Sequence, residues 1–406
     1  MTMKKTLVAL AALAATASFA QVTLSGRIAL AVSTYSANGA TAGAASDAAS
    51  RTMVADNSSR LKFAVNEDLG GGLRAFGVYE FGLNFDTGAG TNQAGGANSA
   101  TAFNGSRESH IGIGNNDIEL RLGRQNVFWT QGDLHDASAN FVGKDAIGDA
   151  YTRLANVRQN NAILLNLNSS SFAGSQLYWA PEVANESAPV SSPTAAQSSA
   201  NATTWGGKLN WDNGAWRFMA DYQKRNNIAT DAAGTFPAAN TTADLTSAKL
   251  GLGYRYAEGS MVAAHYWDQR KDFTDAATNN TATTQAVAGV TGGSMAGGNK
   301  QTGWGVTVKH NLGAGWTGYG SYGVLNNMSA TGTGGDLNDS GSTLISLAVR
   351  KDLSKRTGIY ASYGQVKNAA AGTMGMPGGG FVPVTGPNAA AGSSPTFLLV
   401  GMMHNF

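Results

Sequence analysis

The 406-residue sequence contains no cysteine, which excludes disulfide frameworks, thiolate metal sites and cysteine nucleophiles. It has only 8 prolines, and only 13% of its residues are charged. After residue 20 there is no run of eighteen consecutive apolar residues, so the sequence offers no candidate for a helical membrane span. The absence of long apolar runs does not exclude a transmembrane β-barrel, because only alternate residues of its strands face lipid.

The first twenty residues are predicted to be a cleaved signal peptide. Lys4 and Lys5 form a basic start, residues 6–16 are largely apolar, and Ser18 and Ala20 supply the small residues of a cleavage site. Removing the two lysines from 28 basic residues leaves 26, which equals the 26 acidic residues. The mature chain is therefore formally neutral, and no nucleic acid or other highly charged partner is expected.

Runs of roughly ten residues with alternating apolar and polar side chains recur along the mature chain, and sixteen can be counted. The connections between them are alternately long and short. The long connections are expected at about 36–57, 87–102, 130–156, 185–202, 227–243, 274–300, 328–340 and 368–394. The short turns are expected at 67–71, 115–117, 169–171, 212–214, 257–259, 311–315 and 352–355. Eight long and seven short connections join sixteen strands.

All of the long connections fall on the same side of this alternation. Outer-membrane barrels have long extracellular loops and short periplasmic turns. A soluble exported β-sandwich, the other all-β fold weighed here, has no reason to keep such an asymmetry. The sequence therefore predicts an all-β protein of the outer membrane, in which residues 21–406 form one 16-stranded antiparallel transmembrane β-barrel.

Charged side chains lie on the second face of many runs. Arg217 and Asp221, for example, alternate with Trp216, Phe218 and Ala220. The interior of a sandwich cannot hold unpaired arginine and lysine on many strands, whereas a water-filled lumen can. The pattern thus favours a barrel with lipid outside and water inside.

The last run ends in an aromatic residue, Phe406, and has Leu398, Val400 and Met402 at alternate positions before it. It resembles the C-terminal signature by which the barrel-assembly machinery recognises outer-membrane barrels. Further stretches resemble the trimeric Gram-negative general porins, especially their neisserial and β-proteobacterial branch. These stretches are 22–28, 59–73, 106–113, 122–125, 158–161 and the final run, and the most specific are Glu67-Asp-Leu-Gly-Gly-Gly-Leu73 and Leu122-Gly-Arg-Gln125.

The resemblance implies a homotrimer in contact with outer-membrane lipid and lipopolysaccharide, and a third long loop, about 130–156, that folds into the barrel and narrows it. The basic side of this constriction would be Arg60, Arg107, Arg124 and Arg158, and the acidic side, on the loop, Asp133, Asp136, Asp145 and Asp149. Opposed charges across a narrow pore create a field that orders dipolar solutes and disfavours apolar ones.

Strict alternation conflicts with two of these assignments. It places Arg107 with Ile111, and Arg124 with Leu122, on the face toward lipid. Either these arginines lie beyond the hydrocarbon band, or a β-bulge shifts the register.

The sequence predicts passive diffusion of small hydrophilic solutes and ions, with a mild anion preference motivated by the arginines. A substrate-selective porin for sugars or organic acids, and a surface adhesin that binds partners through its long loops, are alternatives. No enzyme, cofactor or metal is expected, because the five histidines have no ligand spacing and neither a Gly-x-Ser-x-Gly nor a phosphate-binding motif occurs.

Overall fold

The computed structural model describes residues 21–57, 59–83, 85–86, 103–127, 158–181, 202–229, 242–273, 298–331, 336–372, 374 and 390–406. The predicted signal peptide lies outside these residues. Within them the chain is almost entirely β-strand, with one short 3-10 helix, η1 (Ala44–Ser46). No helix among them is long and apolar enough to cross a bilayer.

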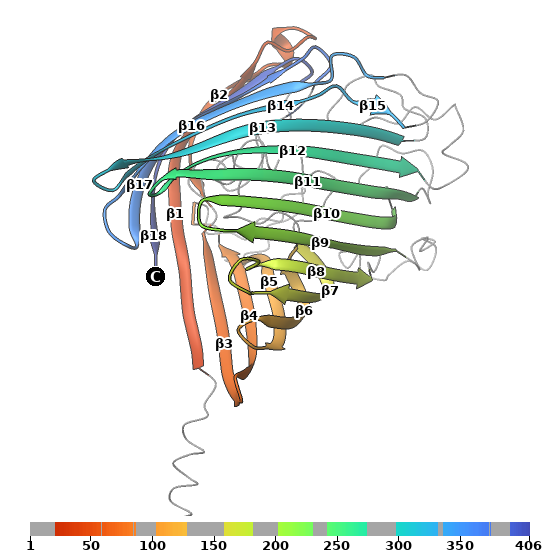
Figure 1. Ribbon diagram of the computed structural model, residues 1–406. Helices are drawn as coiled ribbons and strands as arrows, with labels where there is room; N and C mark the ends of the chain where they lie inside the picture. Colours follow the sequence, from red (N-terminus) through yellow and green to blue (C-terminus); the bar gives the residue numbers. More distant parts are fainter. Residues whose placement is uncertain are drawn as a thin grey trace, which may run out of the picture.

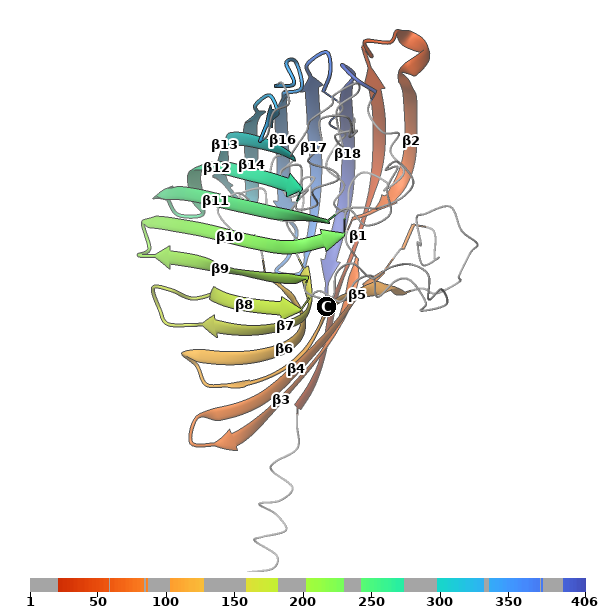
Figure 2. The same ribbon diagram turned by 90° about the vertical axis from the view of Figure 1, so that its right-hand side faces the viewer.

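The strands form a single antiparallel sheet in which sequence neighbours pair (Figure 1, Figure 2). They are β1 (Gln21–Asn38), β2 (Ala48–Asp56), β3 (Arg60–Gly70), β4 (Leu73–Leu83), β5 (Phe103–Gly114), β6 (Ile118–Asn126), β7 (Arg158–Leu167), β8 (Ser175–Pro181), β9 (Thr203–Asp212), β10 (Trp216–Ala229), β11 (Thr242–Ala257), β12 (Ser260–Phe273), β13 (Gly298–Gly313), β14 (Trp316–Leu325), β15 (Ser329–Ala330), β16 (Ser342–Asp352), β17 (Thr357–Asn368) and β18 (Ser394–Asn405). β2 and β3 pair with the two halves of β1 and act as one wall strand, and the two-residue β15 pairs with β13. The wall therefore has sixteen strands, as predicted.

The sheet closes on itself because its first and last strands pair. The β1–β18 ladder runs from Arg27 opposite Asn405 to Asn38 opposite Ser394, and Figure 1 shows the two strands side by side. A bilayer has no water to satisfy an open sheet edge, and each unpaired N–H or C=O there costs several kcal/mol. Closure removes both edges at once.

Apolar side chains cover the outer face of the wall, the reverse of a soluble protein, whereas the inner face carries polar as well as apolar side chains. In β6, Ile118, Leu120 and Leu122 are 41%, 42% and 47% exposed on the outer face, whereas Glu119 is only 3% exposed on the inner face. The same alternation makes Leu398, Val400 and Met402 of β18 exposed and Leu399 and Met403 buried. A slip of one residue between two strands would turn every apolar side chain of a strand inward, so the alternation excludes such registers.

The connections alternate in length as predicted, and the turn chemistry explains the short ones. In the β3–β4 turn, Gly70, Gly71 and Gly72 have φ angles of 86°, 61° and 81°, a region that favours glycine. The first long connection is shorter than predicted. Residues 48–56 were expected in a loop but form β2, which pairs with β1 from Leu30 opposite Asp56 to Ala37 opposite Ala48. Small and polar residues gave these positions a loop-like composition, and pairing with β1 overrides it.

The inner wall is apolar on one side and charged on the other. Phe397, Leu399 and Met403 of β18 pack in one buried cluster with Tyr360 of β17 and Ala29 of β1. Strands β3 to β7, by contrast, carry the four arginines that the sequence analysis singled out, together with Glu80, Glu108 and Glu119. The candidate site therefore lies on one side of the barrel.

The C-terminal residue fastens the closing seam. Gly26 and Phe406 exchange two backbone hydrogen bonds, with N to O distances of 3.0 and 3.1 Å. The ring of Phe406 lies over Gly26 so closely that a Cβ there would be 2.4 Å from a ring atom and 2.6 Å from the carbonyl oxygen of Arg60. Gly26 thus provides the seat for the terminal ring.

Gly26→Ala is expected to weaken the seam. Either the Phe406 ring or the backbone near Arg60 must move, and overpacking of this kind costs about 1–3 kcal/mol. Urea unfolding in detergent micelles, followed by tryptophan fluorescence, measures the loss. Gly320→Ala is the matched control, because a Cβ there meets only a Leu347 methyl at 3.6 Å. Equal stability of the two variants would show that the Phe406 ring does not require a glycine at position 26.

Candidate functional site

Four arginines from four strands gather on the charged side of the inner wall. They are Arg60 of β3, Arg107 of β5, Arg124 of β6 and Arg158 of β7, called here the arginine cluster. Arg107 is within electrostatic reach of both Arg60 and Arg158, and Arg124 within reach of Arg158. The structure therefore brings together all four arginines predicted for the basic side of the constriction.

A β-bulge resolves the conflict over Arg107. In the β4–β5 ladder Glu80 lies opposite Glu108 and Phe81 opposite Ser106, so Arg107 is the extra residue. An extra residue locally breaks the two-residue period, and Arg107 thereby leaves the outward face that strict alternation assigned to it. In the β6–β7 ladder Gly123 lies opposite Ala162 and Gln125 opposite Gln159, so the extra residue of this second bulge belongs to β7. Arg124 itself keeps its register opposite Ser109 of β5.

Hydrogen bonds hold both arginines in place. Arg107 Nε donates to Glu80 Oε1 at 2.5 Å, and both side chains are largely covered, with exposed fractions of 16% and 13%. Arg124 donates through Nη1 to Asn160 Oδ1. Asn161 next to it has a φ of 53°, which marks the irregular backbone on the β7 side of the second bulge.

The wall also supplies acidic groups that the sequence analysis did not assign to the site. Glu80 and Glu108 lie directly opposite each other, with Lys62 opposite Glu80 on the other side. Like charges in this position repel, and the nearby arginines offset the repulsion. The signal for Glu80 was present in the sequence, since counting back from the 67–71 turn places it beside Lys62. Glu108 could not be found in this way, because the bulge lies next to it.

A further cation, Arg27 of β1, lies opposite Arg60 in the β1–β3 register. Its Nε donates to Asn405 Oδ1 at 3.4 Å, so it also contacts the last strand. With Arg27 and Lys62, the patch has six cationic groups and two carboxylates, Glu80 and Glu108. Six minus two leaves four positive charges on this part of the wall.

The acidic side predicted for the loop cannot be placed against this patch. Residues 130–156, with Asp133, Asp136, Asp145 and Asp149, lie outside the described residues. Among the described residues, no group of three or more histidine, aspartate or glutamate side chains is placed to hold a metal ion.

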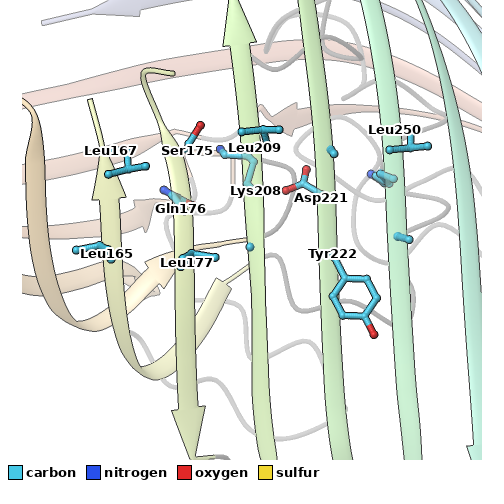
Figure 3. A pocket seen from close by; sticks show the side chains of 14 residues that line it. Leu165, Leu167, Ser175, Gln176, Leu177, Lys208, Leu209, Asp221, Tyr222 and Leu250 are labelled. Atoms are coloured by element: carbon cyan, nitrogen blue, oxygen red, sulfur yellow. The ribbon is translucent and has the colours of Figure 1, made fainter. Parts of the chain in front are cut away.

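A pocket lies elsewhere, on the outer face of β7 to β11 (Figure 3). Its rims are Leu177, Leu209 and Leu250, which are 64%, 44% and 51% exposed, and small residues such as Gly207 and Ala220 form its floor. The volume is about 570 Å³. Because this face is turned to lipid, the pocket is a groove between apolar side chains and not part of a path for polar solutes.

Comparisons with known proteins agree with this architecture. A family model described as Gram-negative porin matches residues 6–371. The major outer membrane protein P.IB of Neisseria meningitidis serogroup B is 31% identical over 172 residues, which are 41% of this chain and 48% of that protein. The chain thus matches about half the length of this curated relative.

Two solved structures show the same fold. The anion-selective porin from Comamonas acidovorans has a TM-score of 0.67 at 21% identity, over 96% of this chain and 100% of that one. The trimer form of OmpT, an outer membrane protein of Vibrio cholerae, has a TM-score of 0.60 at 14% identity, over 95% of this chain and 99% of that one.

Glu80→Ala is expected to destabilise the folded barrel by about 1–3 kcal/mol, because Arg107 would lose its ion-pair partner in a crowded cationic patch. The same urea unfolding assay measures this loss. Glu258→Ala, which removes an exposed carboxylate from the β11–β12 turn, should unfold at the wild-type urea concentration. A Glu80 variant as stable as the Glu258 variant would show that the ion pair contributes nothing.

Proposed function

Because this chain belongs to the Gram-negative porin family, we propose that it forms a water-filled channel for passive diffusion of small hydrophilic solutes and ions, with a preference for anions. It is a barrel of the outer membrane, with an apolar outer face and an inner face that is charged on the side of β3 to β7. The family implies a channel rather than an enzyme.

The observation that carries the anion preference is the charge imbalance on one side of the inner wall. The six cations and two carboxylates around the arginine cluster leave an excess of positive charge. Guanidinium groups stay charged at any physiological pH. A low-dielectric wall focuses their field into the lumen and raises the local concentration of anions.

The range of this field sets the conditions under which it acts. The Debye length is about 8 Å at physiological ionic strength and about 3 Å at 1 M salt. Anion preference should therefore be clear in dilute salt and weaken as salt is added. If the lumen is narrow at the arginine cluster, most of its cross-section lies within reach of the charges.

Several features of the proposal rest on the sequence resemblance. The four arginines would line the narrowest part of the channel, opposite Asp133, Asp136, Asp145 and Asp149 of the third long loop. The working unit would be a homotrimer, which the fold shared with the trimer form of OmpT supports. Contacts with lipopolysaccharide and the barrel-assembly machinery, the latter through Phe406, remain sequence predictions.

Selectivity for organic acids is the second candidate. Two or more guanidinium groups in one patch can bind a carboxylate through paired hydrogen bonds, which a purely electrostatic preference does not require. Ohmic current in chloride with flux of organic acids that does not saturate supports general diffusion. Flux that saturates with organic acids and not with sugars supports the selective channel.

Current through planar bilayers under a salt gradient tests the proposal. Wild-type protein should give stepwise ohmic conductance and a reversal potential of the sign for faster anions. The double variant Arg60→Gln with Arg158→Gln should shift that potential toward cations, because two positive charges leave the wall. Arg356→Gln, in a turn outside the wall, is the matched control and should leave it unchanged.

Two outcomes would count against the proposal, each against a different part. Folded protein that gives no steps would rule out the channel. Steps with the same reversal potential in the wild type and the double variant would rule out the arginine cluster as the source of selectivity.

A further inference from the structure

A second group of arginines lies on the inner wall near the short turns, at the opposite end of the strands from the long connections. Arg74 follows the β3–β4 turn and Arg121 the β5–β6 turn. In the register, Arg74 and Glu119 flank Gly114, and Phe76 and Arg121 flank Gly112. With no side chain on the glycines of β5, the side chains of β4 and β6 meet across it.

Both glycines are needed for this meeting. A Cβ on Gly112 would lie 2.4 Å from a ring atom of Phe76. A Cβ on Gly114 would lie 2.3 Å from the carbonyl oxygen of Ile118 and 2.9 Å from Cγ of Glu119. The ring of Phe76 therefore lies over Gly112 of β5, beneath the two guanidinium groups.

One buried carboxylate holds both guanidinium groups. Glu119, 3% exposed, accepts hydrogen bonds from Arg74 Nη2 and from Arg121 Nε, the latter at 2.9 Å. Asn166 Nδ2 donates to the same carboxylate at 3.4 Å. The guanidinium carbons of Arg74 and Arg121 lie 4.8 and 5.7 Å from the centroid of the Phe76 ring. The two cations are thus fixed in position before any ligand arrives.

The guanidinium groups are held but not covered. The side chains of Arg74 and Arg121 remain 34% and 24% exposed. Asp68, opposite Arg74 in the register, uses Oδ1 to accept the N–H of Gly70 in the turn, at 2.8 Å. Two arginines share Glu119, and Arg74 also donates through Nη1 to Asn66 Oδ1 at 3.5 Å. Each guanidinium group has five N–H donors, so part of their hydrogen-bonding capacity is left for a ligand in the lumen.

We propose that Arg74 and Arg121 form a second anion-binding station, at the periplasmic mouth, for small carboxylates. This inference rests on the proposed channel function. Planar guanidinium groups match the two oxygens of a carboxylate, and pre-organised side chains lose less freedom on binding. A dicarboxylate could contact both arginines at once.

The station is connected to the arginine cluster by charge. Arg121 is within electrostatic reach of Glu108, and Lys62 is within reach of Glu108 and Glu80. Cationic side chains thus follow the inner wall from the cluster to the periplasmic mouth. An anion that leaves the cluster meets the station before it reaches the periplasm.

Block of chloride current by succinate tests the station. Succinate is added to one side of the bilayer at a time, and the periplasmic side is identified with an impermeant thiol reagent on Lys355→Cys, the sole thiol in a chain without cysteine. Wild-type channels should be blocked at lower succinate concentration from the periplasmic side. Arg74→Gln and Arg121→Gln should each raise that concentration at least about tenfold, since each removes a charge-assisted contact.

Arg217→Gln is the matched control. This arginine also lies near a short turn, and its Nε donates to Asn210 Oδ1 at 2.9 Å. The Arg217→Gln substitution removes one positive charge at the same end of the barrel and should leave the succinate block unchanged. The proposed station would be wrong if the wild type and the Arg74 variant were blocked at the same succinate concentration. It would also be wrong if the Arg217 variant changed that concentration as much as the Arg74 variant. Neither outcome would contradict the channel function.

Calorimetric titration of succinate into detergent-folded protein separates the two proposals. If the wild type binds succinate and the Arg74 and Arg121 variants do not, the station is supported. If the wild type binds succinate in this way but does not conduct, only the channel function is wrong. Absence of binding and of sided block in a conducting wild type would overturn the station alone.

Discussion

The need to pair every backbone polar group in a medium without water governs this structure. Strands in lipid cannot leave an edge open, so the sheet closes through the β1–β18 ladder. The terminal residue completes that ladder, because Phe406 exchanges backbone hydrogen bonds with Gly26 and its ring covers the same glycine. Closure in turn separates two environments, lipid outside and the lumen inside, and each strand must serve both.

Departures from the two-residue period coincide with the candidate site. Along most of β6 the alternation is regular, with Leu120 and Leu122 outside and Glu119 inside. The extra residue is Arg107 itself in β5, whose side chain donates to Glu80 on the inner wall, and it belongs to β7 where that strand passes Arg124. A bulge weakens the ladder locally, and here it allows four arginines from four strands to share one patch. The structure thus gives up regular pairing where it concentrates charge.

Glycines on the wall allow side chains to meet across a strand. On the inner face, Gly112 and Gly114 of β5 let Phe76, Arg74, Glu119 and Arg121 join from β4 and β6. On the outer face, Gly207 and Ala220 form the floor of the apolar groove in Figure 3. On both faces a small residue leaves room for the side chains of neighbouring strands. These side chains are charged on the inner face, which is turned to water, and apolar on the outer face, which is turned to lipid.

The sequence by itself determined the architecture, since alternation, turn glycines and the spacing of long and short connections depend on nearest neighbours along the chain. It also identified the four arginines, although only through resemblance to a family. Tertiary structure decided the rest: that residues 48–56 are a strand, that a bulge turns Arg107 away from lipid, and that Glu108 and Arg27 join the patch. Local alternation cannot specify these features, because register and bulges depend on which residue of one strand faces which residue of the next, and that pairing is fixed only when the whole sheet closes.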